Sequence, residues 1–177
     1  MIIIGIGNVL QKDDGLGVYA ATYLNENYTF SEELAIINGG VQGIHLLNVL
    51  EENDHILIFD SIGLDDNPAS IYAIPAQEIS GYGLNNGGAH EIGILQCMDM
   101  LELQGKAIPT AMVLGIVPDE VTFDFGLSKA LTNAFDGYIS VALQYLSKHG
   151  IRHTKKESNT SLQEIIARAK DPSGVMI

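Results

Sequence analysis

The first seventeen residues constrain the fold more than any other stretch, because they combine a strand, a tight loop and the start of a helix. Residues 1–7 are apolar apart from two glycines and predict a core strand. Residues 8–17 predict a loop that carries the adjacent carboxylates of Asp13 and Asp14. Apolar side chains at helical spacing then predict a helix over residues 15–25. The chain therefore opens with a strand–loop–helix unit, which is typical of sheets covered by helices.

The same alternation of strands and helices continues along the chain. A second strand is predicted over residues 34–37, followed by a Gly-rich loop over 38–43 and a short helix over 44–51. A third strand is predicted over residues 55–60, and its apolar run is typical of a parallel strand buried on both faces. With right-handed crossovers, this pattern predicts a parallel sheet with helices on its faces.

The next strand, over residues 70–75, follows too closely for a helical crossover. We therefore expect it to run antiparallel at an edge of the sheet, where Pro75 is tolerated. A helix over residues 90–103, a last strand over 107–117 and a long helix over 126–149 follow. The predicted fold is a single α/β domain in three layers. Its twisted, mostly parallel five-stranded sheet has one antiparallel edge strand and helices on both faces.

The composition changes near Gly150. At 177 residues the chain suits one domain, which we predict over residues 1–150. Residues 151–177 are polar and basic and predict a C-terminal tail that is mobile. Within this tail, the pattern over residues 162–169 predicts a short amphipathic helix.

The charge is strongly acidic and unevenly distributed. The net charge is −13, and residues 1–151 contain only four Lys or Arg against nineteen Asp or Glu. Such a surface excludes nucleic acid and anionic lipid as partners, since both are bound chiefly through basic side chains. No apolar run approaches the ~18 residues that span a membrane, so no membrane insertion is expected. A single cysteine, Cys97, excludes an internal disulfide, and we expect a cytoplasmic monomer with Cys97 in its core.

Three chemically active residues are predicted to meet at the carboxyl edge of the sheet, where open parallel sheets bind ligands. Asp14 lies in the loop after the first strand, Asp60 ends the third strand, and His90 begins a helix after a Gly-rich stretch. Two carboxylates and an imidazole suit a borderline divalent cation. A helix N-terminus also favours the neutral imidazole that metal binding requires. We therefore predict a metal-contacting site, with Asp13 capping the helix that follows.

Other interpretations remain open for each residue alone. Asp14 suits a turn or a cap, Asp60 suits a cap of the following turn, and His90 suits the first turn of a helix without any ligand. Only their joint placement favours a site. A nucleotide-binding domain is a further alternative, but residues 5–10 lack the third glycine of a dinucleotide fingerprint.

Five segments resemble one known family. Gly-Ile-Gly-Asn-Val-Leu at residues 5–10 and Asp-Asp-Gly-Leu-Gly at 13–17 are similar to the opening signature of the hydrogenase maturation endopeptidases. The resemblance extends through residues 58–60, 89–93 and 114–118, and it covers about residues 1–150.

This resemblance implies a nickel-dependent cleavage. Enzymes of the family remove a C-terminal extension from the large-subunit precursor of a nickel–iron hydrogenase after nickel has been inserted. The resemblance assigns the metal contacts to Asp14, Asp60 and His90. It also implies that the precursor, which is the partner, supplies the nickel.

One segment departs from the family pattern. Members commonly carry Asp-Gly-Gly-Thr where this chain has Asn38, Gly39, Gly40 and Val41. These residues are candidates for a substrate loop, but an asparagine cannot act as a base and can only exchange hydrogen bonds. A metal-dependent chaperone that holds the same precursor without cutting it is therefore the alternative to a peptidase.

Overall fold

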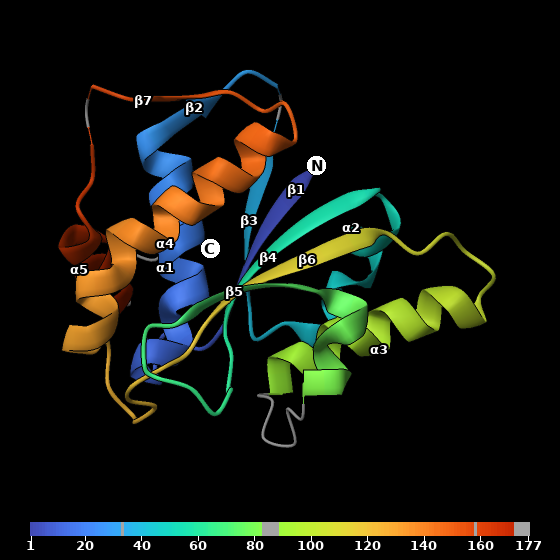
Figure 1. Ribbon diagram of the computed structural model, residues 1–177, viewed down its shortest axis with the longest axis horizontal. Coiled ribbons are helices and arrows are strands. Elements are labelled where there is room, and N and C mark those ends of the chain that lie inside the picture. The colour runs from blue at the N-terminus through green and yellow to red at the C-terminus, as the bar shows by residue number, and fades with distance from the viewer. Residues whose placement is uncertain (33, 83–88, 158, 172–177) are drawn as a thin grey trace.

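The computed structural model describes residues 1–32, 34–82, 89–157 and 159–171, and Figure 1 shows their arrangement. The central sheet contains β1 (Ile2–Ile6), β3 (Ala35–Gly40), β4 (His55–Ser61), β5 (Ile71–Pro75) and β6 (Thr110–Ile116). The strand order is β3-β1-β4-β6-β5, in which only the β5–β6 pair is antiparallel. The predicted α/β fold and its antiparallel edge strand are confirmed.

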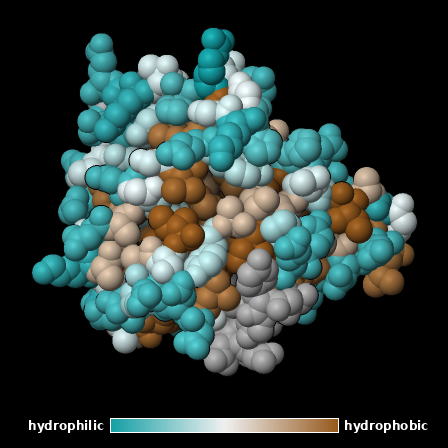
Figure 2. Space-filling view, viewed as in Figure 1, coloured by the Kyte–Doolittle hydropathy of each residue, from teal (hydrophilic) through white to brown (hydrophobic). Residues whose placement is uncertain are grey.

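Helices cover both faces of the sheet. They are α1 (Leu16–Asn27), α2 (Leu47–Glu51), α3 (Ala89–Leu103), α4 (Lys129–Lys148) and α5 (Leu162–Lys170). Helices α1, α4 and α5 pack on one face, and α2 and α3 pack on the other. On the side seen in Figure 2, apolar residues gather over the middle of the molecule, where β5 lies in Figure 1, and hydrophilic residues surround them.

Alternate residues of each central strand contribute to two separate cores. In β4, Leu57 and Phe59 pack with α1 and α4, whereas Ile56 and Ile58 pack with α2 and α3. All five residues of β1 are buried. This burial on both faces explains why these strands are continuous apolar runs in the sequence.

Two glycines allow α1 to lie directly against the sheet. A Cβ atom added to Gly17 would come within 2.2 Å of the Phe59 carbonyl oxygen and 2.3 Å of the Ile6 oxygen. One added to Gly5 would come within 2.4 Å of the Gly17 oxygen. Because side chains are missing here, the start of α1 touches both β1 and β4, and this contact positions the loop that carries Asp14.

Residues 151–157 and 159–171 belong to the same folded body as the rest of the described chain. A ribbon of two three-residue strands, β2 (Tyr28–Phe30) and β7 (His153–Lys155), joins them to the end of α1. Leu162 and Ile165 of α5 are buried in the core beneath α1 and α4. The expectation of a mobile tail is therefore wrong for residues 151–157 and 159–171, because these apolar side chains anchor the segment. The short helix predicted over 162–169 is present as α5.

Helix boundaries differ slightly from those expected, for reasons of capping and pairing. Ser128 caps α4 by accepting a hydrogen bond from the Leu131 N–H, so that this helix begins at Lys129 rather than at 126. Strand β3 extends through Gly40, because its backbone continues to pair with β1. Asn38 and Gly39 thus lie in a strand and not in a loop.

Among the described residues, no helix is both long and apolar enough to cross a membrane.

Candidate active site

Asp14 is held in a fixed orientation by two hydrogen bonds. The backbone N–H of Asn8 donates to Asp14 Oδ2 at 2.8 Å, and the hydroxyl of Ser61 donates to Asp14 Oδ1 at 3.1 Å. Gly7 makes this loop possible, because its φ is +126° and an added Cβ would lie 1.8 Å from the Asp14 carbonyl oxygen. The half-buried carboxylate therefore lies where β1 and β4 end.

Asp60 lies at the carboxyl end of β4 and is only 2 % exposed. Its Oδ1 accepts a hydrogen bond from the Ser61 N–H at 2.8 Å. Strand alternation places Asp60 on the face of the sheet shared by Ile56 and Ile58, which is the face that α3 covers. Burying a carboxylate is costly unless it is hydrogen-bonded, and the Ser61 N–H supplies one such bond.

Tyr138 of α4, on the other side of the sheet, lies close enough to Asp60 for that carboxylate to affect its pKa. Burial raises the pKa of the Tyr138 hydroxyl well above its ordinary value, and the nearby Asp60 raises it further. The phenol therefore stays protonated and donates to the Leu114 carbonyl oxygen at 2.6 Å. This bond joins α4 to β6.

Ser61 connects two of the three predicted residues, because it follows Asp60 in the chain and hydrogen-bonds Asp14. His90 lies in the first turn of α3, but its side chain falls outside what the structure describes. Within the described residues, no group of three or more His, Cys, Asp or Glu side chains is arranged to hold a metal ion. The three-residue metal contact therefore stays a prediction.

The role predicted for Asp13 is wrong. Gly15 is the N-cap of α1, and the chain enters this helix through a 3₁₀ turn over Lys12–Gly15. The buried Asp13 carboxylate instead accepts hydrogen bonds from the backbone N–H groups of Asp119 at 3.0 Å, Glu120 at 2.8 Å and Ser128 at 2.6 Å. No local pattern could have revealed this role, because the partners lie more than a hundred residues away.

Lys12 also connects the loop after β1 to the loop after β6, on the solvent side of Asp13. Its backbone N–H donates to the Asp124 carbonyl oxygen at 2.7 Å, and its ammonium group pairs with Glu120. The hydrogen bond to Glu120 raises the pKa of Lys12. Lys12 has a φ of +54°, a strained conformation for a residue with a side chain, and such strain persists where the surrounding contacts over-determine the backbone.

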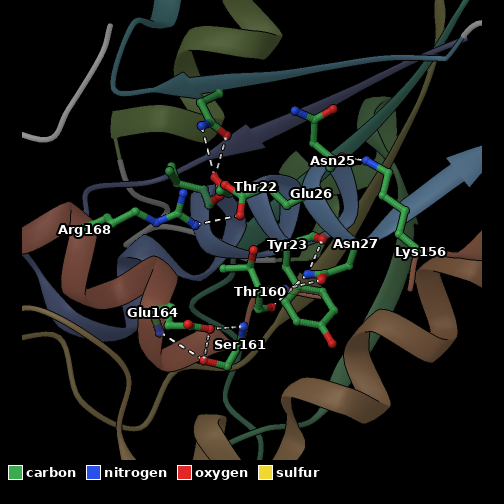
Figure 3. A network of polar contacts seen from close by, with 12 residues as sticks. Thr22, Tyr23, Asn25, Glu26, Asn27, Lys156, Thr160, Ser161, Glu164 and Arg168 are labelled. Carbon is green, nitrogen blue, oxygen red and sulfur yellow. Dashed lines mark hydrogen bonds and ion pairs between the residues drawn. The ribbon is translucent and has the colours of Figure 1, made fainter. Parts of the chain in front are cut away.

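Asn38 lies beside the first helix. Its amide nitrogen donates to the Thr22 hydroxyl of α1 at 3.1 Å. Both residues line a cavity of about 390 Å³ between α1, β3 and α5. Figure 3 shows Thr22 and Glu26 on one side of this region and Arg168 of α5 on the other, with Arg168 paired to Glu26 at 2.7 Å.

Among the substrate-loop candidates, Gly40 contacts the loop that carries Asp14. Its carbonyl oxygen accepts a hydrogen bond from the Gly7 N–H at 3.1 Å. Gly39 packs close to β1, since an added Cβ would lie 2.8 Å from the Ile4 side chain. The glycines of this segment therefore serve the close contact between β3, β1 and the loop that holds Asp14.

Cys97 has the structural role that the sequence predicts. It is fully buried on α3, and its thiol lies 3.7 Å and 3.8 Å from the carbonyl oxygens of Gly43 and Ile44. Burial raises the pKa of the thiol, which disfavours the reactive thiolate.

The fold and the site together define an α/β protein with oriented aspartates at the carboxyl edge of a parallel sheet. The profile of the family described as "Hydrogenase maturation protease" matches residues 18–145. The chain therefore belongs to the hydrogenase maturation protease family, which confirms the resemblance seen in the sequence. The matched residues include Asp60 and His90, whereas Asp14 precedes them.

Individual relatives agree with this assignment. The chain is 26 % identical over 162 residues to the hydrogenase expression/formation protein HupM of Azotobacter chroococcum, covering 90 % of this chain and 77 % of that one. It is 23 % identical over 159 residues to the hydrogenase 2 maturation protease of Escherichia coli, covering 89 % and 97 %.

Solved structures share the fold. The hydrogenase maturating endopeptidase HybD from Escherichia coli superposes with a TM-score of 0.80 at 22 % identity, covering 88 % of this chain and 96 % of that one. The nickel–iron hydrogenase maturation protease HybD from Thermococcus kodakarensis gives a TM-score of 0.65 at 23 % identity, covering 81 % and 97 %.

Proposed function

We propose that this protein is an endopeptidase that removes the C-terminal extension of a nickel–iron hydrogenase large-subunit precursor after nickel insertion. Membership of the maturation protease family supports the substrate class. The observation that carries the proposal is the orientation of Asp14 by Asn8 and Ser61, beside Asp60, where parallel strands end. As the sequence predicts, we expect the enzyme to act as a cytoplasmic monomer.

In the proposed mechanism, Asp14, Asp60 and His90 contact nickel that the precursor already holds. Each carboxylate oxygen has two lone pairs, so Asp14 can keep its bonds from Asn8 and Ser61 while it binds a cation. Such hydrogen bonds fix the direction from which a ligand approaches the metal. The bound nickel then either polarises the scissile carbonyl or lowers the pKa of the attacking water.

A non-cleaving chaperone for the same precursor is the second candidate. It is favoured by Asn38 and Val41, which replace the Asp and Thr common in the family. The Asn38 side chain bonds Thr22, so an asparagine in place of the family's aspartate alters the cavity beside α1. This arrangement is compatible with cleavage directed by Asp14 and Asp60.

The test incubates the purified protein with nickel-loaded and nickel-free precursor and follows the shortened subunit by mass spectrometry. We expect cleavage of the nickel-loaded precursor only, and none with Asp14→Ala. Equal cleavage of both precursors would exclude nickel recognition. Binding without cleavage would instead favour the chaperone, and unchanged cleavage by His90→Ala would remove His90 from the mechanism.

A further inference from the structure

Exposed apolar side chains gather at the edge of the sheet that carries Asp14. In the described part of the chain, five exposed large apolar residues lie in the segments that follow β1, β3 and β6, with Ile44 in a 3₁₀ turn, and we call them the apolar rim: Leu10, Val41, Ile44, Val121 and Phe123. Phe123 exposes 85 % of its surface and Val121 exposes 52 %. Large exposed apolar patches with polar surroundings mark interaction sites.

The distribution of these side chains over the molecule is uneven. Two other large apolar residues in the described segments, Leu103 and Ile108, are also exposed. Only short segments separate them from Thr110, where β6 begins, so both lie at the opposite edge of the sheet. Among the described residues, the candidate active site is thus at the edge that carries five of the seven exposed large apolar side chains.

Backbone hydrogen bonds join the three loops of the apolar rim into one surface. The Gly7 N–H donates to Gly40, next to Val41, at 3.1 Å. The Lys12 N–H donates to Asp124, next to Phe123, at 2.7 Å. Leu10 lies between these two connections, on the loop that also carries Asp14. A partner that reaches Asp14 therefore meets the apolar rim on both sides of it.

The loops around the apolar rim are strongly acidic. Residues 7–15, 41–46, 62–70 and 117–128 contain one lysine, Lys12, and no arginine. The same segments contain seven acidic residues: Asp13, Asp14, Asp65, Asp66, Asp119, Glu120 and Asp124. Two copies of such an edge would repel each other, whereas a basic partner would be attracted.

We propose that the apolar rim is the docking surface for the hydrogenase large-subunit precursor, with Phe123 as its main anchor. The complementary face of the precursor is an apolar patch bordered by lysine or arginine side chains. This inference rests on the proposed function, because the substrate must approach Asp14 through this surface. Exposed aromatic side chains commonly carry much of the binding energy of an interface.

The test compares two full-length variants, Phe123→Ser and Leu103→Ser. The two side chains are equally exposed, at 85 % and 87 %, so neither substitution removes packed core. We expect Phe123→Ser to raise KM for nickel-loaded precursor, and the calorimetric Kd, about tenfold while kcat stays within about twofold. Leu103→Ser should behave as the unsubstituted protein, and association should slow as salt increases.

The outcomes separate this inference from the proposed function. If Phe123→Ser cleaves the precursor with unchanged KM and Kd, the proposed docking surface is wrong and the peptidase assignment stands. The same holds if Leu103→Ser raises KM and Kd as much as Phe123→Ser does. Binding without cleavage that Phe123→Ser weakens supports the docking surface and overturns the peptidase assignment. An association rate that does not depend on salt would contradict the proposed lysine or arginine border on the precursor. If the protein forms a concentration-dependent dimer that Phe123→Ser abolishes, the apolar rim binds a second copy of this chain and is not the docking surface for the precursor.

Discussion

Asp13 and Asp14 are neighbours with opposite roles. Asp13 is fully buried and accepts three backbone N–H groups from the segment after β6, whereas Asp14 is half-buried and faces the end of β4. The first carboxylate holds two loops together, and the second is the one that we propose contacts nickel. Two adjacent aspartates therefore differ in role: Asp13 is structural, and Asp14 is proposed to be catalytic.

Substitution by asparagine should distinguish these roles. Asp13→Asn places an NH₂ group against backbone donors and leaves at least one buried N–H without an acceptor, so we expect a loss of about 3 kcal/mol in the free energy of unfolding. Asp14→Asn should change stability by less than about 1 kcal/mol and abolish cleavage. Urea denaturation measures both variants, and equal stabilities would contradict the structural role of Asp13.

The active-site residues could be predicted to different extents. Asp14 and Asp60 were accessible from the sequence, because each follows an apolar strand and strand ends share an edge. The bond that Ser61 donates to Asp14 was not, since a serine has no pattern that reveals a partner 47 residues away. The role of Asp13 was hidden for the same reason.

At the scale of elements, the contact between α1 and the sheet depends on the absence of side chains. Gly17 lies against the carbonyl oxygens of Phe59 and Ile6, and Gly5 lies against Gly17 itself. Helix α1 carries Thr22 and Glu26 along the cavity beside β3, and its first turn follows Asp14 directly. A displacement of this helix would therefore move the active-site loop.

Gly17→Ala should destabilise the fold strongly. Its Cβ would lie 2.2 Å from a backbone oxygen that cannot move aside, and we expect a loss of about 3 kcal/mol or more. Gly137→Ala is a matched control in the exposed middle of α4, where an added Cβ meets nothing within 4 Å. Alanine there should stabilise the protein by up to about 1 kcal/mol. Thermal or urea unfolding that ranks the variants in the reverse order would refute this account.

The elements themselves followed from the sequence where the hydrophobic pattern was long. The apolar runs of β1 and β4 and the repeating apolar face of α4 each have one consistent interpretation. The three-residue strands β2 and β7 have no such pattern, and they form only because Tyr28 and Lys155 are brought together by tertiary packing. The strand over Asn38 and Gly39 was missed because glycine usually indicates a turn.

At the scale of the whole molecule, the C-terminal segment completes the core. Ile151, Leu162 and Ile165 pack with α1 and α4, and Ser161 and Glu164 form a capping box at the start of α5. The Asn27 side chain also accepts a hydrogen bond from the Thr160 N–H at 2.6 Å. Although this segment is polar and basic in composition, its few apolar side chains make it an integral part of the fold.

A chain that ends at Thr160 should be markedly less stable than one that ends at Lys170. It lacks the burial of Leu162 and Ile165, which contributes about 3 to 6 kcal/mol at roughly 1.5–3 kcal/mol for each buried side chain. Urea denaturation of the two truncated chains measures the difference. Equal midpoints would show that α5 contributes nothing to the core.

The reach of Asp13 across the chain has a consequence for synthesis on the ribosome. The loop that carries Asp13 and Asp14 is made well before Ser128, whose N–H binds Asp13 and follows it by 115 residues. Contacts between such distant residues form late, because the intervening chain must first be ordered. The loop that carries Asp14 therefore acquires its final contacts only after Ser128 has been synthesised, so the candidate active site is not complete on a nascent chain that ends before this residue.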